Sequence, residues 1–278
     1  MAISSGAAPR ADGAAMTAPA LADHTGAASP MGAPIDPGVM ETGSFWIWGG
    51  LALLTLIWAW KDGRLPLFGL VLIAATSSFW QEFFGDWGAY VAWNPAFARL
   101  PFWGTMAYTT PVKPLFVPFS WGWWFGISIP LLVALVRWLH GKFPTVSIFT
   151  LAMVTAFPLF LAYQINVEGG SVAKGWWTYD SVIGPALTSA KGRLPLIFPL
   201  LLGLWAGWFV ALLARRDADG FMPHEVRRGI PGLAPGWRRE LARVVAMIVL
   251  FQLTFFVLNT APPIIGRLLF GAPSVLVP

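Results

Sequence analysis

The chain has 278 residues, of which 56% are hydrophobic and only 11% are charged. A soluble domain usually carries about 25% charged residues, so this composition excludes an ordinary soluble protein and indicates a membrane protein. There is no cysteine, which excludes disulfides, thiolate catalysis and cysteine-ligated metals. The net charge of +5 comes largely from arginines in short loops between apolar runs. Membrane orientation explains that charge better than a nucleic-acid partner does.

The first 43 residues differ in composition from the rest. They are rich in Ala, Gly, Pro and Ser and contain no apolar run of the kind found in signal peptides. This composition predicts a disordered tail over residues 1–43 and a transmembrane helical domain over residues 44–278.

Six apolar segments follow the tail, and about 20 residues of helix cross the hydrocarbon core of a bilayer. We therefore predict an all-α fold, a polytopic membrane helix bundle of about six transmembrane helices. Prolines inside three of the segments are expected only to kink the helices, because neighbouring helices can satisfy the freed carbonyls. The segments are Ser44–Trp60, Leu65–Phe84, Leu115–Trp138, Pro144–Ile165, Leu194–Ala214 and Leu241–Ala261.

Six spans place the loops alternately on two sides of the membrane. Basic residues are in excess on the side that holds the Arg215–Arg239 loop. The positive-inside rule then predicts that this side is cytoplasmic and that both termini face outward, in a bacterial-type cytoplasmic membrane. The opposite side holds two long loops, Gly85–Pro114 and Asn166–Arg193, rich in Trp, Tyr, Pro and Gly. Long loops on a rigid scaffold are where binding sites are usually built.

Three carboxylates near these loops are the candidate catalytic residues. Glu82 and Asp86 are four positions apart, so they share one face of a helix, and Glu168 follows the end of the fourth span. Even-numbered spans end on one side, so the three acids are expected to meet in one cavity. A carboxyl at Glu82, among Trp80 and two phenylalanines, is expected to keep its proton near neutral pH and act as a general acid. Alternatively, these acids cap the helices at the membrane interface.

Other polar and aromatic residues on the same side are candidates for substrate binding. Asn94 precedes a proline and could equally form a turn, and Lys113 could be a counter-ion or an interfacial anchor. The 17 tryptophans invite a cation-stabilising pocket, although an aromatic belt at the membrane interface is their usual role. The candidates are Asn94, Tyr179, Asp180, Asn166, Trp80 and Lys113.

Several chemistries are set aside by the residues that are missing. None of the three histidines lies in the loops or span ends that carry the acids, since His24 is in the tail, His140 in a cytoplasmic linker and His224 in the basic loop, and this argues against a haem or a His-rich di-iron site. There is no P-loop and no G-x-S-x-G nucleophile elbow. We therefore expect no cofactor and no metal. The expected partners are a hydrophobic small-molecule substrate and the lipid bilayer, with no nucleic acid, and the sequence leaves the oligomeric state open.

The stretch Trp80–Gly126, WQEFFGDWGAYVAWNPAFARLPFWGTMAYTTPVKPLFVPFSWGWWFG, resembles the avermectin spirocyclase (AveC-like) family of integral membrane proteins. The resemblance lies in an acid, a second acid four residues later and a loop rich in Trp, Asn and Pro. The later NVEGG and WWTYD segments are similar to the second polar loop of that family. The resemblance implies an enzyme that closes a hydroxy-ketone to a spiroketal with loss of water, as in polyketide biosynthesis. It also implies site roles for Glu82, Asp86, Asn94, Glu168 and Tyr179.

The residues themselves fit such a reaction. A protonated Glu82 could donate to the leaving hydroxyl, and an ionised Asp86 or Glu168 could accept the proton of the attacking hydroxyl. A different acid-catalysed cyclisation or isomerisation would use the same groups. The alternatives from other classes are a transporter or lipid-binding membrane protein without chemistry, in which the acids couple protons or gate, and a structural subunit of a larger complex.

Overall fold

A computed structural model describes residues 35–278, apart from positions 105, 191, 272 and 275. Helix α1 (Gly38–Asp62) begins six residues before the predicted boundary at residue 44, so residues 38–43 are helical. Residues 35–37 precede this helix, and residues 1–34 of the predicted tail lie outside the described residues. The prediction of a helical membrane bundle is confirmed: among the described residues, five helices are long and apolar enough to cross a membrane, or six if a bent pair counts as one span.

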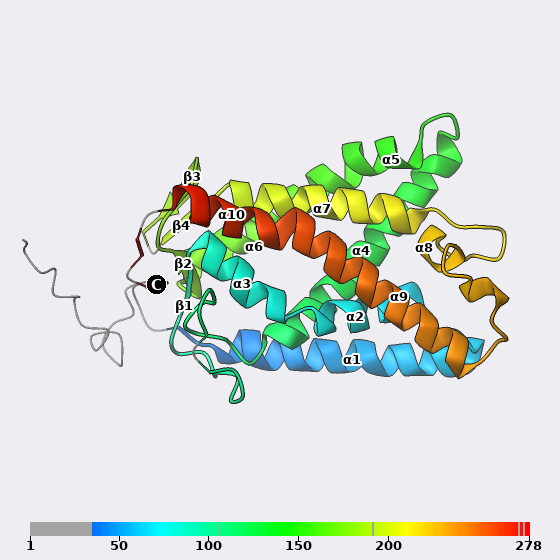
Figure 1. The fold of residues 1–278 in the computed structure, drawn as a ribbon, viewed down its shortest axis with the longest axis horizontal. Helices are drawn as coiled ribbons and strands as arrows, with labels where there is room; N and C mark the ends of the chain where they lie inside the picture. Colours follow the sequence, from blue (N-terminus) through cyan, green and yellow to red (C-terminus); the bar gives the residue numbers. More distant parts are fainter. Residues whose placement is uncertain (1–34, 105, 191, 272, 275) are drawn as a thin grey trace, which may run out of the picture.

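The six predicted apolar segments all form helices, which pack into one elongated bundle, some along the long axis of the molecule and some oblique to it (Figure 1). The fourth and sixth, like the second, consist of more than one element, and both run beyond their predicted C-terminal ends, although the fourth begins at Ile148 rather than at Pro144. In chain order the spans are α1; α2 (Leu67–Ser77) with α3 (Trp80–Ala89); α4 (Val117–Lys142); α5 (Ile148–Leu151), η2 (Ala152–Ala156) and α6 (Phe157–Lys174); α7 (Ile197–Ala214); and α9 (Trp237–Phe255), η4 (Phe256–Thr260) and α10 (Ala261–Phe270).

The second segment is not the straight span that its continuous apolar run suggests. It breaks after Ser77, and α3 leaves α2 at an angle of 62°. The hydroxyls of Ser77 and Ser78 both donate to the carbonyl of Ala74, at 2.7 and 2.8 Å, and so compete with the helical hydrogen bonds. On the far side of the break, the Gln81 side chain accepts a hydrogen bond from Thr260 at 3.0 Å and donates to the carbonyl of Gln252 at 3.2 Å. These bonds fix the direction of α3.

Two spans contain a π-helical turn, and each turn is followed by proline. Element η2 precedes Pro158, and η4 precedes Pro262 and Pro263. Proline has no N–H and its ring clashes with the carbonyl four residues earlier. A wider π turn at that place accommodates the ring, and such turns are frequent at functional sites.

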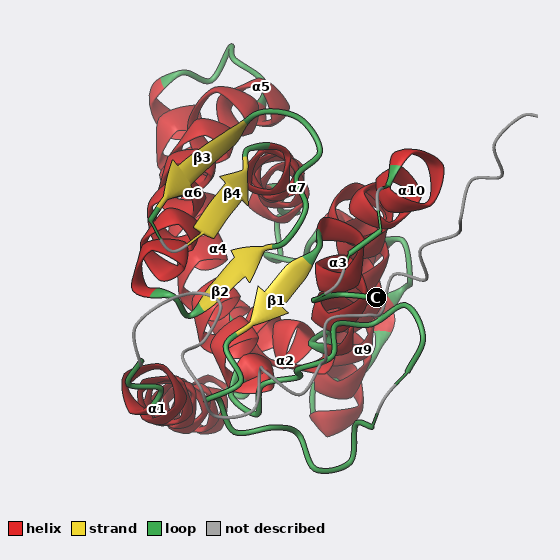
Figure 2. Cartoon of the chain, turned by 90° about the vertical axis from the view of Figure 1, so that its left-hand side faces the viewer, coloured by secondary structure: helices red, strands yellow, loops and turns green. Residues whose placement is uncertain are grey.

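Four short strands close one end of the bundle, facing the viewer in Figure 2. They form two antiparallel pairs, β1 (Val91–Trp93) with β2 (Trp177–Tyr179), and β3 (Ala186–Ser189) with β4 (Gly192–Pro195). The sequence analysis did not predict them. The first pair joins the two long loops that flank the candidate acids.

A buried ion-pair network lies at the opposite end. Arg243 of α9 donates to Glu225 at 2.7 Å and to Glu240 at 2.6 Å. It also donates to the carbonyl of Leu65 at 3.1 Å, and the Leu65 amide donates to Glu240 at 2.9 Å. The network therefore joins the start of α2 to α9 and to the short helix α8 (Pro223–Val226). A single turn, η3 (Ile230–Gly232), leads from α8 towards α9.

Candidate active site

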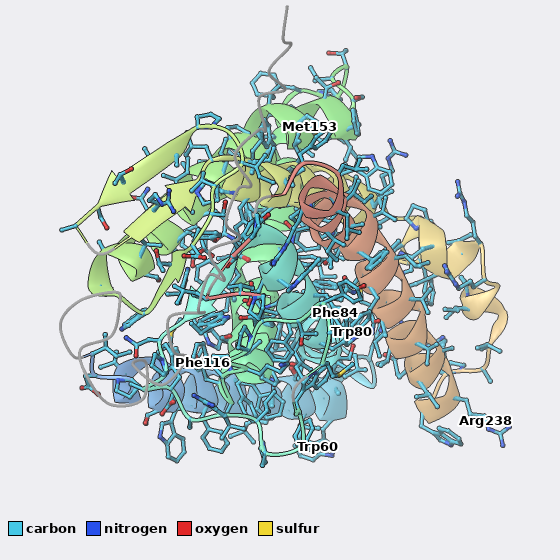
Figure 3. The ribbon with its side chains drawn as sticks, turned by 60° about the vertical axis from the view of Figure 1, so that its left-hand side comes forward. Trp60, Trp80, Phe84, Phe116, Met153 and Arg238 are labelled. Atoms are coloured by element: carbon cyan, nitrogen blue, oxygen red, sulfur yellow. The ribbon has the colours of Figure 1, made fainter. Side chains whose placement is uncertain are left out.

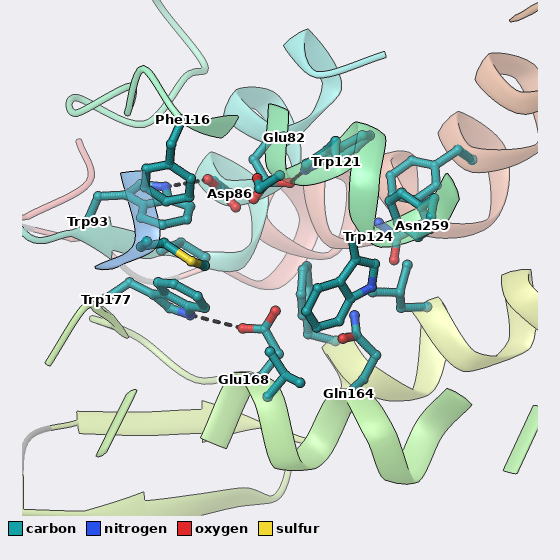
Figure 4. Close-up of a pocket in the computed structure, with 18 of the residues that line it drawn as sticks. Glu82, Asp86, Trp93, Phe116, Trp121, Trp124, Gln164, Glu168, Trp177 and Asn259 are labelled. Carbon is teal, nitrogen blue, oxygen red and sulfur yellow. Dashed lines mark hydrogen bonds between the residues drawn. The ribbon is translucent and has the colours of Figure 1, made fainter. Parts of the chain in front are cut away.

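The three predicted catalytic carboxylates line one cavity of about 90 Å³ near the strand-capped end of the bundle (Figure 4). Each helix presents residues spaced by three or four positions, which is the spacing of one helical face. Helix α3 contributes Glu82 and Asp86, and α6 contributes Gln164 and Glu168. Helix α4 contributes Ser120, Trp121, Trp124 and Phe125, and α7 and the last span complete the wall with Phe198, Leu202, Phe255 and Asn259.

Each carboxylate on α3 accepts a hydrogen bond from an indole. Trp121 Nε1 donates to Glu82 Oε2 at 2.6 Å, and Trp93 Nε1 donates to Asp86 Oδ2 at 2.6 Å. Asp86 is buried, whereas Glu82 keeps some exposure to the cavity. Within the described chain, no hydrogen bond reaches the second oxygen of either group. One oxygen of each carboxyl is therefore held in place, and the other has no hydrogen-bond partner among the described residues.

Glu168 is held in the same way on the opposite wall. Its Oε2 accepts hydrogen bonds from Trp177 Nε1 at 2.9 Å and from the Tyr179 hydroxyl at 3.2 Å. Figure 4 shows the Glu168 carboxyl directed across the cavity towards Asp86 and Glu82. Three carboxyls from two helices thus face one space, each positioned by an aromatic donor.

The pairing of β1 with β2 sets these donors in place. The register places Trp93 opposite Trp177, and Val91 opposite Tyr179. Side chains two positions apart in a strand point to the same face, so all four line the cavity. The Trp93 and Trp177 rings lie 4.7 Å apart between centroids, as a cross-strand pair. The strand pair therefore couples the donor to Asp86 with the donor to Glu168.

No lysine or arginine is among the described residues that line the cavity, so the carboxylates have no cationic partner there. The nearby phenol responds to this environment. Burial, followed by the charges of Glu168, Asp86 and Glu82, raises the pKa of Tyr179 well above its usual value. Tyr179 therefore remains a hydrogen-bond donor at all physiological pH values.

Two amide side chains add unused hydrogen-bonding capacity. Gln164 Oε1 and Asn259 Oδ1 are buried in the cavity wall, and neither has a hydrogen-bond partner among the residues that the structure describes. A buried polar atom without a partner costs about 1–3 kcal/mol. Both are thus suited to a polar group of a bound molecule. Sequence analysis left them out of the candidate residues.

Five of the six predicted substrate-binding residues lie outside the cavity lining, and Tyr179 is the exception. Asn94 is buried in a turn, where its side chain accepts from the Ala96 amide at 3.0 Å and donates to the carbonyl of Gly175 at 2.8 Å. This is the turn role weighed from the sequence. Lys113 is also buried and donates to the carbonyl of Thr110 at 2.8 Å. Burial lowers the pKa of Lys113, and no acid pairs with it within the described residues.

The other three are engaged elsewhere. Asp180 accepts a hydrogen bond from Ser274 at 2.6 Å, and Asn166 donates to the carbonyl of Ala162 in its own helix. Trp80 packs edge-on against Phe84, and the two residues are labelled next to each other in Figure 3. Sequence analysis considered the tryptophans only together, as a cation-stabilising pocket or an aromatic belt, and did not predict that Trp93, Trp121 and Trp177 donate hydrogen bonds to the acids. Trp93 follows Asp86 by 7 residues and Trp177 follows Glu168 by 9, whereas Trp121 lies in α4, 39 residues from Glu82, so no nearby acid in the sequence pointed to its role.

A family model described as spirocyclase AveC-like matches residues 62–277 of the chain. The chain belongs to the spirocyclase AveC-like family. Searches against curated proteins and against solved structures gave no match. All the residues that line the cavity, apart from Met40, fall inside the matched range.

Membership of the spirocyclase AveC-like family points to a cyclase role for this membrane protein. The polar groups that line the cavity include carboxyls, amides, a phenol and indoles. In the described part of the chain, no group of three or more His, Asp or Glu side chains is placed to hold a metal ion. Side chains of these kinds can transfer protons and stabilise charge.

Proposed function

We propose that the chain is an integral membrane cyclase that closes a hydrophobic hydroxy-ketone to a spiroketal by proton transfer between carboxyl groups. One observation carries the proposal. Glu82, Asp86 and Glu168 enter one cavity with no lysine or arginine in its described lining, each held through one oxygen and open at the other. This arrangement suits catalysis by paired acids and bases.

The three groups hold at least one proton between them at neutral pH. Three adjacent negative charges would repel one another, and the enclosed cavity gives little water to screen them. A carboxylic acid and a carboxylate therefore coexist in the cavity. Which of the three carries the proton at a given moment is a property of the group as a whole.

The reaction begins with a hemiketal, formed when one hydroxyl of the substrate adds to its ketone. Glu82 donates its proton to the hemiketal hydroxyl. The bond between that oxygen and the carbon then breaks, water leaves, and an oxocarbenium ion remains. The second hydroxyl then attacks the cationic carbon, and Asp86 or Glu168 takes its proton. One water is lost, and the proton given by Glu82 is recovered by the group of carboxyls.

The cavity walls fit this cationic intermediate. The faces and edges of Trp93, Trp121 and Trp177 surround it, and aromatic faces stabilise cations. The unpartnered oxygens of Gln164 and Asn259 can accept hydrogen bonds from the substrate hydroxyls and so orient the attack. Fixed walls then decide which face of the cation is attacked, and hence the stereochemistry of the product.

The cavity is small for a ligand site, since about 90 Å³ is below the roughly 300–1,000 Å³ of typical small-molecule sites. A substrate larger than the reacting ring system must therefore displace part of the wall. Met40 at the start of α1 is the flexible part of that wall, because its unbranched thioether side chain adopts many rotamers. Displacement of this side chain opens the cavity beside α1.

The experiment uses a symmetric probe, a nine-carbon ketone with its carbonyl on the central carbon and a hydroxyl on each end. Uncatalysed ring closure yields a racemic spiroketal, so an enzyme is recognised by an excess of one enantiomer. Purified protein in nanodiscs is expected to give that excess, measured by chiral gas chromatography. A racemic product, formed at the rate of empty nanodiscs, would contradict the proposal.

Glu82→Gln tests the assigned acid. We expect turnover to fall by at least about 100-fold, the lower range of general-acid contributions, with an unchanged melting midpoint. Glu41→Gln is the matched control, because Glu41 accepts a hydrogen bond from the Ala98 amide at 2.7 Å outside the cavity. Full activity in Glu82→Gln would remove Glu82 from the mechanism.

A further inference from the structure

A second cavity, of about 330 Å³, lies at the end of the bundle opposite the strands. Four arginines from four parts of the chain line it. Arg64 follows α1, Arg137 lies in the last part of α4, Arg216 follows α7 and Arg243 lies in α9. Asp62 is the acidic residue in its described lining. The proposed cyclase mechanism uses none of these residues.

The four guanidinium groups differ in how many hydrogen bonds and ion pairs they form. Arg243 is committed to its two buried ion pairs, with Glu225 and Glu240. Arg64 donates to the carbonyls of Asp219 and Gly220 at 3.2 Å, and Arg216 has one long contact of 3.5 Å with the Gly220 carbonyl. For the residues that the structure describes, the ion pairs involve only Arg239 and Arg243 as cations. Three cationic groups of the cavity therefore lack an acidic partner.

Like charges in such a cluster repel one another when no anion is bound, and this repulsion destabilises the folded protein. Burial, followed by the like charges of Arg137, Arg243 and Arg64 and opposed by Glu225, lowers the pKa of Arg216 to about 10. Arg216 is therefore still charged at neutral pH, among other cations and partly withdrawn from water. A bound anion would relieve this repulsion, because charge-assisted hydrogen bonds to arginine are among the strongest in proteins.

The position and the shape of the cavity identify the kind of anion. Three guanidinium groups offer more donors than the two oxygens of a carboxylate can accept, whereas a terminal phosphate presents three oxygens. The remaining wall is apolar, with Trp58, Leu65 and Leu67. Trp58 is half exposed on the outer side of α1, a helix that buries little of its surface. Basic cavities between membrane helices at the cytoplasmic end are typical of sites for phosphorylated lipid headgroups.

We propose that Arg64, Arg137 and Arg216 form a binding site for a phosphate group, separate from the cyclase cavity. The phosphate belongs to the headgroup of an anionic phospholipid in the adjacent leaflet or to a soluble phosphate compound. In either case the guanidinium groups bind the phosphate oxygens, and the Trp58 side of the cavity faces the attached apolar chain when there is one.

The test uses the full chain, purified in a mild detergent and stripped of lipid. Its melting midpoint is measured against short-chain phosphatidic acid, short-chain phosphatidylcholine and sodium pyrophosphate, and an apparent Kd is taken from each titration. Stabilisation by phosphatidic acid alone supports a lipid headgroup. Stabilisation by pyrophosphate as well supports a soluble phosphate compound. Stabilisation by neither, or equally by phosphatidylcholine, overturns the site.

Two substitutions assign the effect to the cavity. Arg137→Gln and Arg216→Gln should each weaken the apparent Kd about 10-fold or more, which corresponds to the loss of one charge-assisted hydrogen bond. Arg227→Gln is the control, because Arg227 is exposed at the same end and does not line the cavity. Equal weakening in all three variants would show a diffuse surface effect and overturn the site. Arg137 is itself exposed on α4, so its substitution tests the site even if Arg216→Gln does not fold.

Discussion

At the scale of single residues, the carboxyls of the strand-end cavity are held by tryptophan N–H groups rather than by cations. An indole donates one hydrogen bond and carries no charge, so it fixes a carboxyl without neutralising it. Arginine or lysine in the same place would hold the carboxyl permanently ionised. Three indoles on three acids therefore preserve the ability of the group to give and take protons.

Trp121→Phe tests this role. The substitution removes the hydrogen bond to Glu82 Oε2 and keeps an aromatic ring between Phe125 and Phe255. Loss of a hydrogen bond to a charged or catalytic carboxyl is expected to lower kcat about 10- to 100-fold, with a smaller change in KM. Trp123→Phe is the control, since the Trp123 N–H has no partner in the described chain and its ring is outside the cavity lining. Equal rates for the two variants would contradict the positioning role.

His224, in α8, is expected to make the stability of the protein depend on pH. Burial is the largest cause that lowers the pKa of His224 to about 4, with Arg228, Arg216 and Arg243 acting in the same direction and Glu225 against them. An unfolded histidine titrates near 6.5. Between these values the unfolded chain binds more protons, so stability is fully present above about pH 6.5 and falls as the pH drops towards about 4.

We expect His224→Leu to flatten this dependence, because leucine removes two ring nitrogens that have no hydrogen-bond partner among the described residues. The measurement is the melting midpoint of both proteins from pH 7.5 to about 4.5. The wild-type midpoint should fall more steeply with acid than that of the variant. Parallel curves would show that other groups control acid stability.

At the scale of elements, the break between α2 and α3 decides where the acids point. The α3 helix lies against α10 so closely that Gly88 has no room for a side chain. An added Cβ at Gly88 would lie 2.5 Å from the backbone nitrogen of Ile264. Backbone atoms cannot move aside as a flexible side chain can, so this glycine sets the distance between the two helices.

Gly88→Ala is therefore expected to destabilise the protein by about 1–3 kcal/mol, the usual cost of overpacking. It should also reduce turnover, because α3 carries Glu82 and Asp86. The matched control is Gly50→Ala in α1, where an added Cβ meets nothing within 4 Å. A melting midpoint for Gly88→Ala as high as that of the control would show that α3 and α10 separate at little cost.

The elements also show what the sequence could predict. Long apolar runs predicted the spans because a membrane helix needs about 20 such residues. The same criterion could not find the break at Ser77, since hydropathy continues through it and hydroxyl competition is a local effect. The convergence of Glu82, Asp86 and Glu168 followed from topology alone. The strand register that sets Trp93 and Trp177 did not, because a tryptophan at the membrane interface and one in a cavity have similar sequence neighbours.

At the scale of the whole molecule, the two cavities lie at opposite ends of one bundle. The carboxyl cavity is next to the strands, and the arginine cavity is next to α8 and the start of α9 (Figure 1). The positive-inside rule predicts that the arginine end faces the cytoplasm. The substrate would then react in the outer half of the membrane, and an anionic lipid of the inner leaflet would contact the arginines.

The orientation can be tested by labelling, because the chain has no cysteine of its own. Single cysteines are introduced by Phe102→Cys, in the exposed loop after β1, and by Arg227→Cys, at the arginine end. In intact cells a membrane-impermeant maleimide should label the first cysteine and not the second, and in permeabilised cells it should label both.

The reverse labelling pattern would mean that the protein has the opposite orientation in the membrane. The carboxyl cavity would then face the cytoplasm, where soluble precursors could reach it directly, and the arginine cavity would lie in the outer leaflet. Because the rule counts basic residues in short loops, such a result would mean that the excess of arginine at that end is retained for binding rather than for insertion.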